Sequence, residues 1–266
     1  MNRRLCFRIA GFAIGLMIIG LWKFVVDARF VSPMYLPEPA RAWSALVNGF
    51  TEGELASRLV LTLEHIVLGW LFASIVGVVV GSLLGVSRFA RVFIAPMLEI
   101  FRPLPAAALF PVAISIFGLN EKMVVAVIGF GAVWPTLLAT VHGFDTVHER
   151  LRDVRHLLEL SRWNYIRKVA LPNASPHILA GMRLSLTYAL VLSVTGEMLS
   201  SSEGLGFWIM QQARSFRADG VFAGVILFGV IGYVTAQLMS VLERWMLRWR
   251  ENERVGAHAR SAVAPA

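Results

Sequence analysis

Long apolar runs separated by short polar segments dominate the chain. An α-helix needs about 20 mainly apolar residues to cross the hydrocarbon core of a bilayer. The runs are continuously apolar rather than alternating, which disfavours a β-barrel, and only helices then satisfy the backbone in lipid. The pattern predicts an all-α, polytopic membrane protein with six transmembrane helices. The predicted spans are residues 10–26, 59–86, 93–118, 123–141, 178–199 and 221–242.

The largest polar interruption is the mixed-charge segment of residues 145–184, which lies between the fourth and fifth runs. Apolar residues recur at helical spacing on both sides of Ser161, and serine suits the N-cap of a second helix. The segment predicts two short amphipathic helices near the membrane surface, with a stop at Leu171 and Pro172. A face for lipid head groups and a docking face for a protein are both open alternatives.

Two of the runs carry signs of how they pack. Ala73, Gly77, Gly81 and Gly85 recur every four residues, so one face of the second span is small and lets another helix approach closely. Prolines are frequent in the third run and each removes a backbone donor. We therefore expect a helix that is interrupted near residues 102–105.

The fifth run has one face of small or polar residues that ends in a carboxylate. Gly181, Ser185, Ala189, Ser193 and Glu197 recur there at four-residue spacing. Such a face is costly in lipid, so it must contact another helix or an aqueous path. We favour the path, and predict a permeation path lined by Ser185, Ala189, Ser193 and Glu197.

Composition and charge agree with a membrane protein. Hydrophobic residues make up 57% of the chain, charged residues 16%, and the net charge is +8. With both termini in the cytoplasm, 18 of the 25 lysines and arginines lie on the inner side, as the positive-inside rule requires. These residues are dispersed over loop ends, so a nucleic-acid partner is not expected.

Common catalytic motifs are absent from the sequence. There is no phosphate-binding GxxxxGK[ST] loop, no HExxH pair and no GxSxG turn. The single cysteine excludes a disulfide framework and a cysteine-rich zinc site. We expect no catalytic residue, no metal site and no ATP hydrolysis by this chain itself. Carboxylates within the spans are few, so transport powered by a proton relay is weakly supported.

Four stretches resemble the membrane-spanning permease subunits of bacterial ABC importers, in the nitrate, sulfonate and taurine branch. They are LPEPARAW, FRPLPAAALFPVAISIFG, SRWNYIRKVALPNASPHILAGMRL and EGLGFWI. The resemblance covers nearly the whole chain. It implies a fold like that of type I ABC importers, with a cytoplasmic coupling-helix loop in residues 145–184.

In that family the loop carries the EAA motif, which docks into an ATPase subunit. Residues 169–172, Val-Ala-Leu-Pro, match its end well. Counting back, Asp153 takes the acidic position, Arg155 one of the alanines, and Glu159 the glycine, so the front half is degenerate. A glycine would turn sharply there at less cost than Glu159. By this resemblance, the ATPase-coupling residues are Asp153, Arg155, Glu159, Ser161, Arg162, Trp163, Arg167, Leu171 and Pro172.

The resemblance also implies partners and a domain layout. The chain would form a homodimer in the bacterial inner membrane, receive solute from a periplasmic binding protein, and bind ABC ATPase subunits that hold ATP and Mg. Residues 1–57 would form a first helix and periplasmic segment, 58–248 the permease core, and 249–266 a disordered cytoplasmic tail. Rival hypotheses are a pyrimidine or vitamin-precursor permease, a self-contained secondary transporter and, more weakly, a membrane enzyme.

Overall fold

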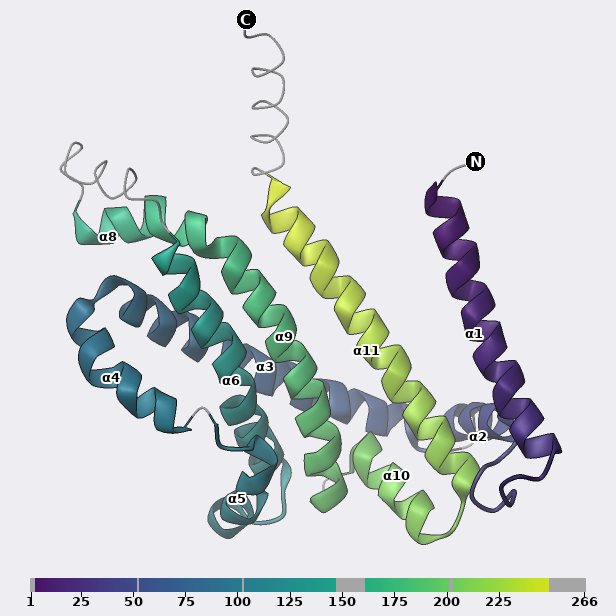
Figure 1. Ribbon diagram of the computed structural model, residues 1–266. Coiled ribbons are helices and arrows are strands. Elements are labelled where there is room, and N and C mark those ends of the chain that lie inside the picture. Colours follow the sequence, from purple (N-terminus) through teal and green to yellow (C-terminus); the bar gives the residue numbers. More distant parts are fainter. Residues whose placement is uncertain (1–2, 52, 102, 147–160, 201–202, 249–266) are drawn as a thin grey trace, which may run out of the picture. The chain divides into compact units, whose positions relative to one another are not determined.

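The computed structural model describes residues 3–51, 53–101, 103–146, 161–200 and 203–248. Within these ranges all regular structure is helical, which confirms the predicted all-α class (Figure 1). The elements are α1 (Arg3–Asp27), α2 (Pro39–Thr51), α3 (Leu55–Val86), α4 (Arg88–Phe101), the 3₁₀ helix η1 (Ala106–Leu109), α5 (Phe110–Phe117), α6 (Glu121–Asp145), α8 (Arg162–Tyr165), the π-helix η2 (Ile166–Ala170), α9 (Leu171–Leu199), α10 (Leu205–Arg214) and α11 (Ala218–Met246).

Four helical stretches of the described chain are long and apolar enough to cross a membrane. They are Leu55–Val86, Glu121–Asp145, Trp163–Leu199 and Ala218–Met246. A fifth crossing is possible if the bent pair Phe89–Phe101 and Ala106–Phe117 forms one broken span. Helix α1 is 25 residues long but is not among these stretches. The count of six spans therefore stays a prediction.

The chain divides into two compact units. Unit 1 comprises residues 1–62 and 197–230, and unit 2 comprises residues 63–196 and 231–266. The divisions fall inside α3, α9 and α11. In unit 1, the Trp22 indole N–H donates to the Pro37 carbonyl at 3.0 Å, and the Trp22 ring lies 5.4 Å from that of Phe222. These contacts hold the end of α1 against the segment before α2 and the start of α11.

In unit 2, helices α3 and α6 run parallel in close contact. A Cβ atom added at Gly77 would lie 2.9 Å from Cβ of Thr136, and one added at Gly81 would lie 2.7 Å from Cβ of Thr140. The same constant offset relates Gly69 to Ile128 and Gly85 to Phe144. An offset of constant sign and size means that both helices point the same way. The predicted small-residue face is therefore a helix-packing face, as expected for small residues at four-residue spacing.

Because α3 and α6 are parallel, the residues between them must bring the chain back to the starting end of α3. The interrupted segment α4, η1 and α5 makes this return, with an 82° bend between its two halves (Figure 1). The predicted interruption near residues 102–105 is confirmed, since α4 ends at Phe101 and η1 begins at Ala106. Asn120 then caps α6 by accepting from the Met123 N–H.

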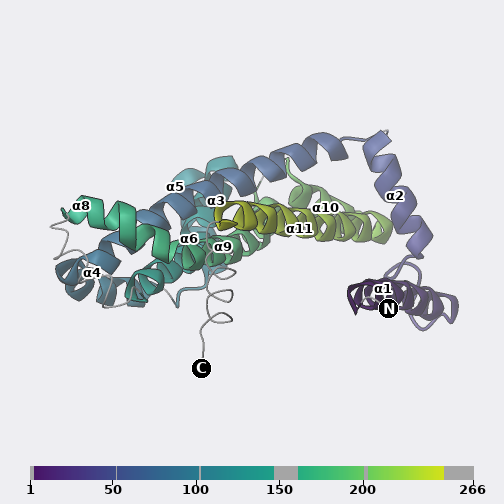
Figure 2. The same ribbon diagram turned by 90° about the horizontal axis from the view of Figure 1, so that it is seen from above.

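Helices α9 and α11 complete the bundle of unit 2 in alternating directions. Gly143 of α6 packs on Ala174 of α9, and Gly196 of α9 packs on Val124 of α6, so this pair is antiparallel. Arg183 pairs with Glu243 of α11 at 3.7 Å and Leu190 lies against Gly232, which makes α9 and α11 antiparallel as well. Figure 2 shows α6, α9 and this part of α11 side by side from above. The end of α6, the start of α9 and the end of α11 therefore lie at one end of the unit.

The predicted stop at Leu171 and Pro172 is wrong. The chain passes from α8 through η2 into α9 without leaving the helix, and Trp163–Leu199 forms one helical stretch of 37 residues. The Leu171 N–H donates to the Ile166 carbonyl five residues back, as in a π-turn. Pro172 has no N–H, and its ring would strike a carbonyl in a regular α-helix. The wider turn just before it relieves this conflict, so the helix continues.

We predict that Gly81→Val destabilises the protein by about 1–3 kcal/mol, because the added methyl groups overpack the α3–α6 contact. The Leu137 carbonyl oxygen would lie only 2.8 Å from the new Cβ, and a backbone atom cannot rotate away. The measurement is the thermal unfolding of the purified chain in detergent. Gly229→Val is the matched control, since nothing lies within 4 Å of a Cβ built there. Equal stability of the two variants would show that α3 and α6 are not in this contact.

Candidate functional site

The four predicted path residues lie on one face of α9, and all four are buried. Ser185, Ala189, Ser193 and Glu197 each have an exposed fraction of 0%. In unit 2 the Ser185 hydroxyl donates to the Ala132 carbonyl of α6 at 2.6 Å, and the Ser193 hydroxyl donates to the Leu190 carbonyl at 2.9 Å. The two serines thus take part in helix packing and helix hydrogen bonding. Their role in a path stays a prediction.

Glu197 lies in unit 1, where its carboxylate holds the start of α10. Oε2 accepts from the Thr62 hydroxyl at 2.8 Å and from the Gly206 N–H at 2.9 Å. The Thr62 hydroxyl oxygen accepts in turn from the Leu205 N–H at 2.8 Å. The first N–H groups of a helix lack partners within it, and a carboxylate there also complements the helix dipole. Glu197 and Thr62 therefore act as a cap that comes from other helices.

Gly204 makes this cap possible. It is the N-cap residue of α10, and a Cβ added there would collide with the Glu197 carboxylate. The glycine brings the backbone of α10 within hydrogen-bonding distance of that buried side chain. The stretch EGLGFWI, which carries part of the family resemblance, is thus the start of a helix that a distant carboxylate caps.

The predicted coupling residues are described only in part. Asp153, Arg155 and Glu159 lie outside the described residues, within the stretch 147–160 of the predicted loop. Ser161 accepts from the Asn164 N–H at 3.3 Å, which confirms the predicted N-cap, although the helix that follows is not short and continues to Leu199. Trp163 has an exposed fraction of 68% and Arg167 is also exposed, whereas Leu171 and Pro172 are half-buried.

A buried apolar cluster joins the end of α6 to the second half of this segment. Phe144, Ala170, Ala174 and Ile178 form it, and all four are buried. The Phe144 ring also lies against Gly85 of α3, where an added Cβ would be 2.5 Å from Cβ of Phe144. Phe144 therefore contacts α3, η2 and α9 together.

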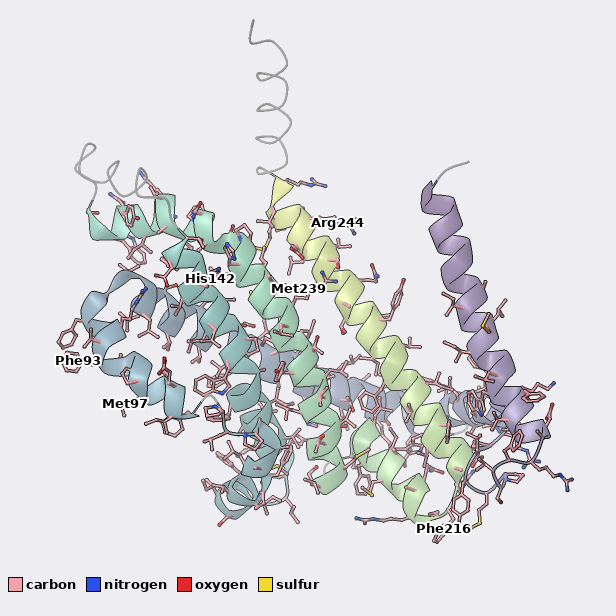
Figure 3. All side chains as sticks on the ribbon, in the orientation of Figure 1. Phe93, Met97, His142, Phe216, Met239 and Arg244 are labelled. Carbon is pink, nitrogen blue, oxygen red and sulfur yellow. The ribbon has the colours of Figure 1, made fainter. Side chains whose placement is uncertain are left out.

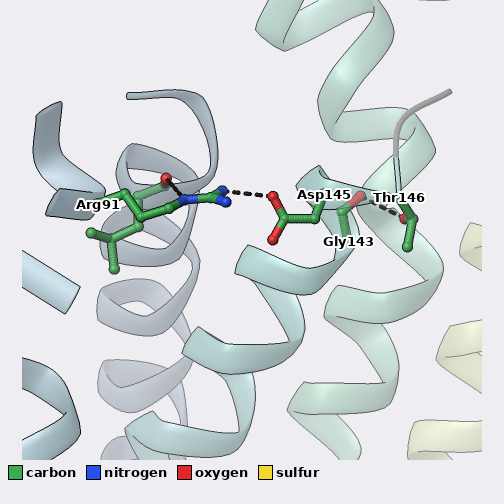
Figure 4. Close-up of polar contacts among 5 residues, drawn as sticks. Arg91, Gly143, Asp145 and Thr146 are labelled. Atoms are coloured by element: carbon green, nitrogen blue, oxygen red, sulfur yellow. Dashed lines mark hydrogen bonds and ion pairs between the residues drawn. The ribbon is translucent and has the colours of Figure 1, made fainter. Parts of the chain in front are cut away.

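The residue after Phe144 is tied to α4 by an ion pair (Figure 4). Nη2 of Arg91 lies 2.6 Å from Oδ1 of Asp145, and Nε of Arg91 donates to the Leu84 carbonyl near the end of α3 at 3.3 Å. A guanidinium at a helix C-terminus also complements the helix dipole. Both side chains are partly exposed, so the pair adds little to stability, and it links the last turn of α6 to α4.

His142, at the end of α6, contacts a second histidine. Figure 3 shows it beside the start of α9, and its ring meets that of His177 edge to face, with centroids 5.1 Å apart. No group of three potential metal ligands occurs among the described residues. This ring contact joins the end of α6 to the start of α9.

The comparison with known families decides what kind of protein has this fold. Residues 59–248 match the binding-protein-dependent transport system inner membrane component family. The chain belongs to this family. The matched residues run from α3 to α11, and so include the parallel α3–α6 pair, the cap of α10 and the joint at Phe144.

Individual relatives place this permease in the predicted branch. It is 33% identical to the Bacillus subtilis (strain 168) protein named as an aliphatic sulfonates transport permease, SsuC, over 91% of this chain and 88% of that one. It is 25% identical to the nitrate import permease protein NrtB of Leptolyngbya laminosa, over 85% and 83% of the two chains. The taurine transport system permease protein TauC of Escherichia coli (strain K12) is 26% identical, over 88% and 86%. These relatives are transport permeases and not enzymes.

A solved structure shares the fold. A chain of the inward-facing methionine ABC transporter MetNI superposes on this permease with a TM-score of 0.65 at 19% identity. The match covers 72% of this chain and 95% of that chain. The predicted resemblance to ABC importer permeases is thereby confirmed in sequence and in fold.

We predict that Glu197→Ala destabilises the permease by about 3 kcal/mol, because it leaves the Gly206 N–H and the Thr62 hydroxyl buried without an acceptor. Glu197→Gln keeps a carbonyl oxygen at the same place and should cost less than about 1 kcal/mol. Thermal unfolding in detergent measures both effects. Glu203→Ala, at an exposed neighbouring carboxylate, is the control. If Glu197→Ala unfolds at the same temperature as this control, the carboxylate does not cap α10.

Proposed function

We propose that the chain is one half of a homodimeric importer that passes a small organic or inorganic anion across the bacterial inner membrane. A periplasmic binding protein delivers the solute, and separate ATPase subunits bind ATP with Mg and supply the energy. The observation that carries this proposal is the family match over residues 59–248, which spans the whole bundle of unit 2. The names of the sulfonate, nitrate and taurine relatives support an anionic solute.

The helix directions of unit 2 support a six-span topology. The α3–α6 pair is parallel, so the bent α4–α5 segment has to cross the membrane as one broken span if its neighbours do. With α1 as the first span, a six-span topology requires the start of α1, the end of α6 and the end of α11 to be on one side of the membrane. The lysine and arginine distribution assigns that side to the cytoplasm.

The joint between α6 and α9 supports the assignment of the coupling site. Trp163 and Arg167 are exposed on the helix that follows the polar segment, where another protein can reach them. Behind them, Ala170 packs on Phe144, and Phe144 packs on Gly85 of α3. A force applied by an ATPase at the exposed residues is thus transmitted through a buried contact to two transmembrane helices.

We predict that Arg167→Glu lowers ATP-driven uptake at least about tenfold, because a carboxylate replaces a guanidinium on the docking face. The permease should still insert in the membrane, since Arg167 is exposed and makes no ion pair with the described residues. Uptake and the amount of copurified ATPase subunit are measured together. Lys23→Glu on α1 is the control for charge reversal. Arg155→Glu and Arg162→Glu test the rest of the predicted face, and unchanged uptake in all three variants would exclude the docking assignment.

A path along the small face of α9 has a separate test in single-cysteine variants. Cysteines at Ser185 or Ser193 in a Cys6→Ser background should react with water-soluble thiol reagents during ATP turnover and be protected at rest. Protection at rest follows from their complete burial. The path requires α6 and α9 to separate when the transporter cycles. Protection throughout turnover would leave this face with a packing role alone.

A further inference from the structure

A groove between α3 and α6 remains unexplained by the coupling site and by the cap of α10. It lies within unit 2, on the face of the α3–α6 pair that is lined by Leu68 and Phe72. Its volume is about 660 Å³. Leu68 has an exposed fraction of 49% and Phe72 of 59%. Gly129 supports its shape, because a Cβ there would lie 2.9 Å from Cδ1 of Phe72 and push the ring outward.

The groove is apolar along its length and charged at one end. Of its twelve lining residues, eight are aliphatic, aromatic or glycine. The other four are Glu64 and His65 on α3 and Glu121 and Lys122 on α6. The register of the parallel pair places these four at nearly the same level, at the end where α6 begins. A long apolar body with one polar end describes an amphiphile rather than a small inorganic ion.

The dimensions match one leaflet of the bilayer. From Leu68 to Val76, α3 rises about 12 Å at about 1.5 Å per residue. Half the hydrocarbon thickness of a bilayer is about 15 Å. The charged end coincides with the first turn of a helix that crosses the membrane, which is where head groups lie. The groove therefore has the length and the polarity gradient of an acyl chain and its head group.

The charges at the end select the kind of head group. Glu64, Glu121 and Lys122 are exposed, and the ion pairs found among the described residues involve none of them. Two carboxylates and one ammonium carry a net negative charge and repel an anionic head group. They suit a head group that carries both a phosphate and a primary ammonium. Lys122 can pair with the phosphate, while the carboxylates accept hydrogen bonds from the ammonium. A trimethylammonium group has no N–H to donate.

We infer that this groove is a binding site for phosphatidylethanolamine, with the acyl chain along Leu68, Phe72 and Val76 and the head group at Lys122, Glu64 and Glu121. The site differs from the proposed coupling and path residues, and its occupation stabilises the α3–α6 pair. The inference does not depend on the identity of the transported solute.

The test is the thermal stability of the full chain in detergent with added palmitoyl-oleoyl phosphatidylethanolamine, phosphatidylcholine or phosphatidylglycerol. Phosphatidylethanolamine should raise Tm by about 4 °C relative to the other two lipids. Ala126→Phe fills the groove, and Lys122→Gln with Glu64→Gln removes the head-group partners. Each should reduce that difference to less than about 1 °C.

The controls are Ala180→Phe, at an exposed position of α9, and Lys23→Gln on α1, and both should keep the full difference. Equal stabilisation of the unmodified chain by all three lipids would overturn the inference without any variant. So would an effect of Ala126→Phe no larger than that of Ala180→Phe. Equal stabilisation by taurine in the absence of lipid would overturn it too, and would assign the groove to a solute. No ATPase is present, so none of these outcomes bears on the proposed import function.

Discussion

The close parallel contact of α3 with α6 determines the arrangement of the whole of unit 2. Gly69, Gly77, Gly81 and Gly85 remove the side chains that would separate the two backbones. In a membrane, where water supplies no hydrophobic drive between helices, such close packing is a main source of association. Once these two helices point the same way, the intervening chain must return, and the proline-rich segment does so in two pieces joined by a sharp bend.

The same contact reaches the end of the bundle at which the polar segment begins. Gly85 is the last small residue of the α3 face, and the ring that fills the space above it belongs to Phe144. Phe144 packs in turn on Ala170, within the π-helix that leads into α9. Arg91 restrains the following residue, Asp145, from α4. The exposed residues Trp163 of α8 and Arg167 of η2 are thus connected to the transmembrane helices through one aromatic side chain, without an intervening loop.

Periodicity predicted what depends on one helix alone, and it could not give the contacts that two distant segments make together. Four-residue spacing of Ala73, Gly77, Gly81 and Gly85 predicted a packing face, but nothing in that spacing gives its partner or its direction. Glu197 was predicted to line a path because a carboxylate on an apolar helix is costly, and that role stays a prediction. The hydrogen-bond partners of its carboxylate, the Thr62 hydroxyl and the Gly206 N–H, come from other helices, and the four-residue spacing of α9 does not predict them.

Local rules also failed at Pro172, where a proline normally indicates the end of a helix. The π-turn before it depends on a change from four-residue to five-residue hydrogen bonding, which no composition signal reports. The family resemblance was informative because it rests on whole stretches of sequence rather than on single residues. Three of those stretches coincide with the bend after α4, the start of α9 and the cap of α10.

We propose that this permease moves solute only as part of an ATP-driven assembly. The most direct measurement is uptake into proteoliposomes that contain the chain alone, or the chain with its ATPase subunits and binding protein. We predict no uptake by the chain alone under a proton or sodium gradient, and uptake that requires ATP and both partners in the complete system. Uptake driven by an ion gradient through the chain alone would contradict the account.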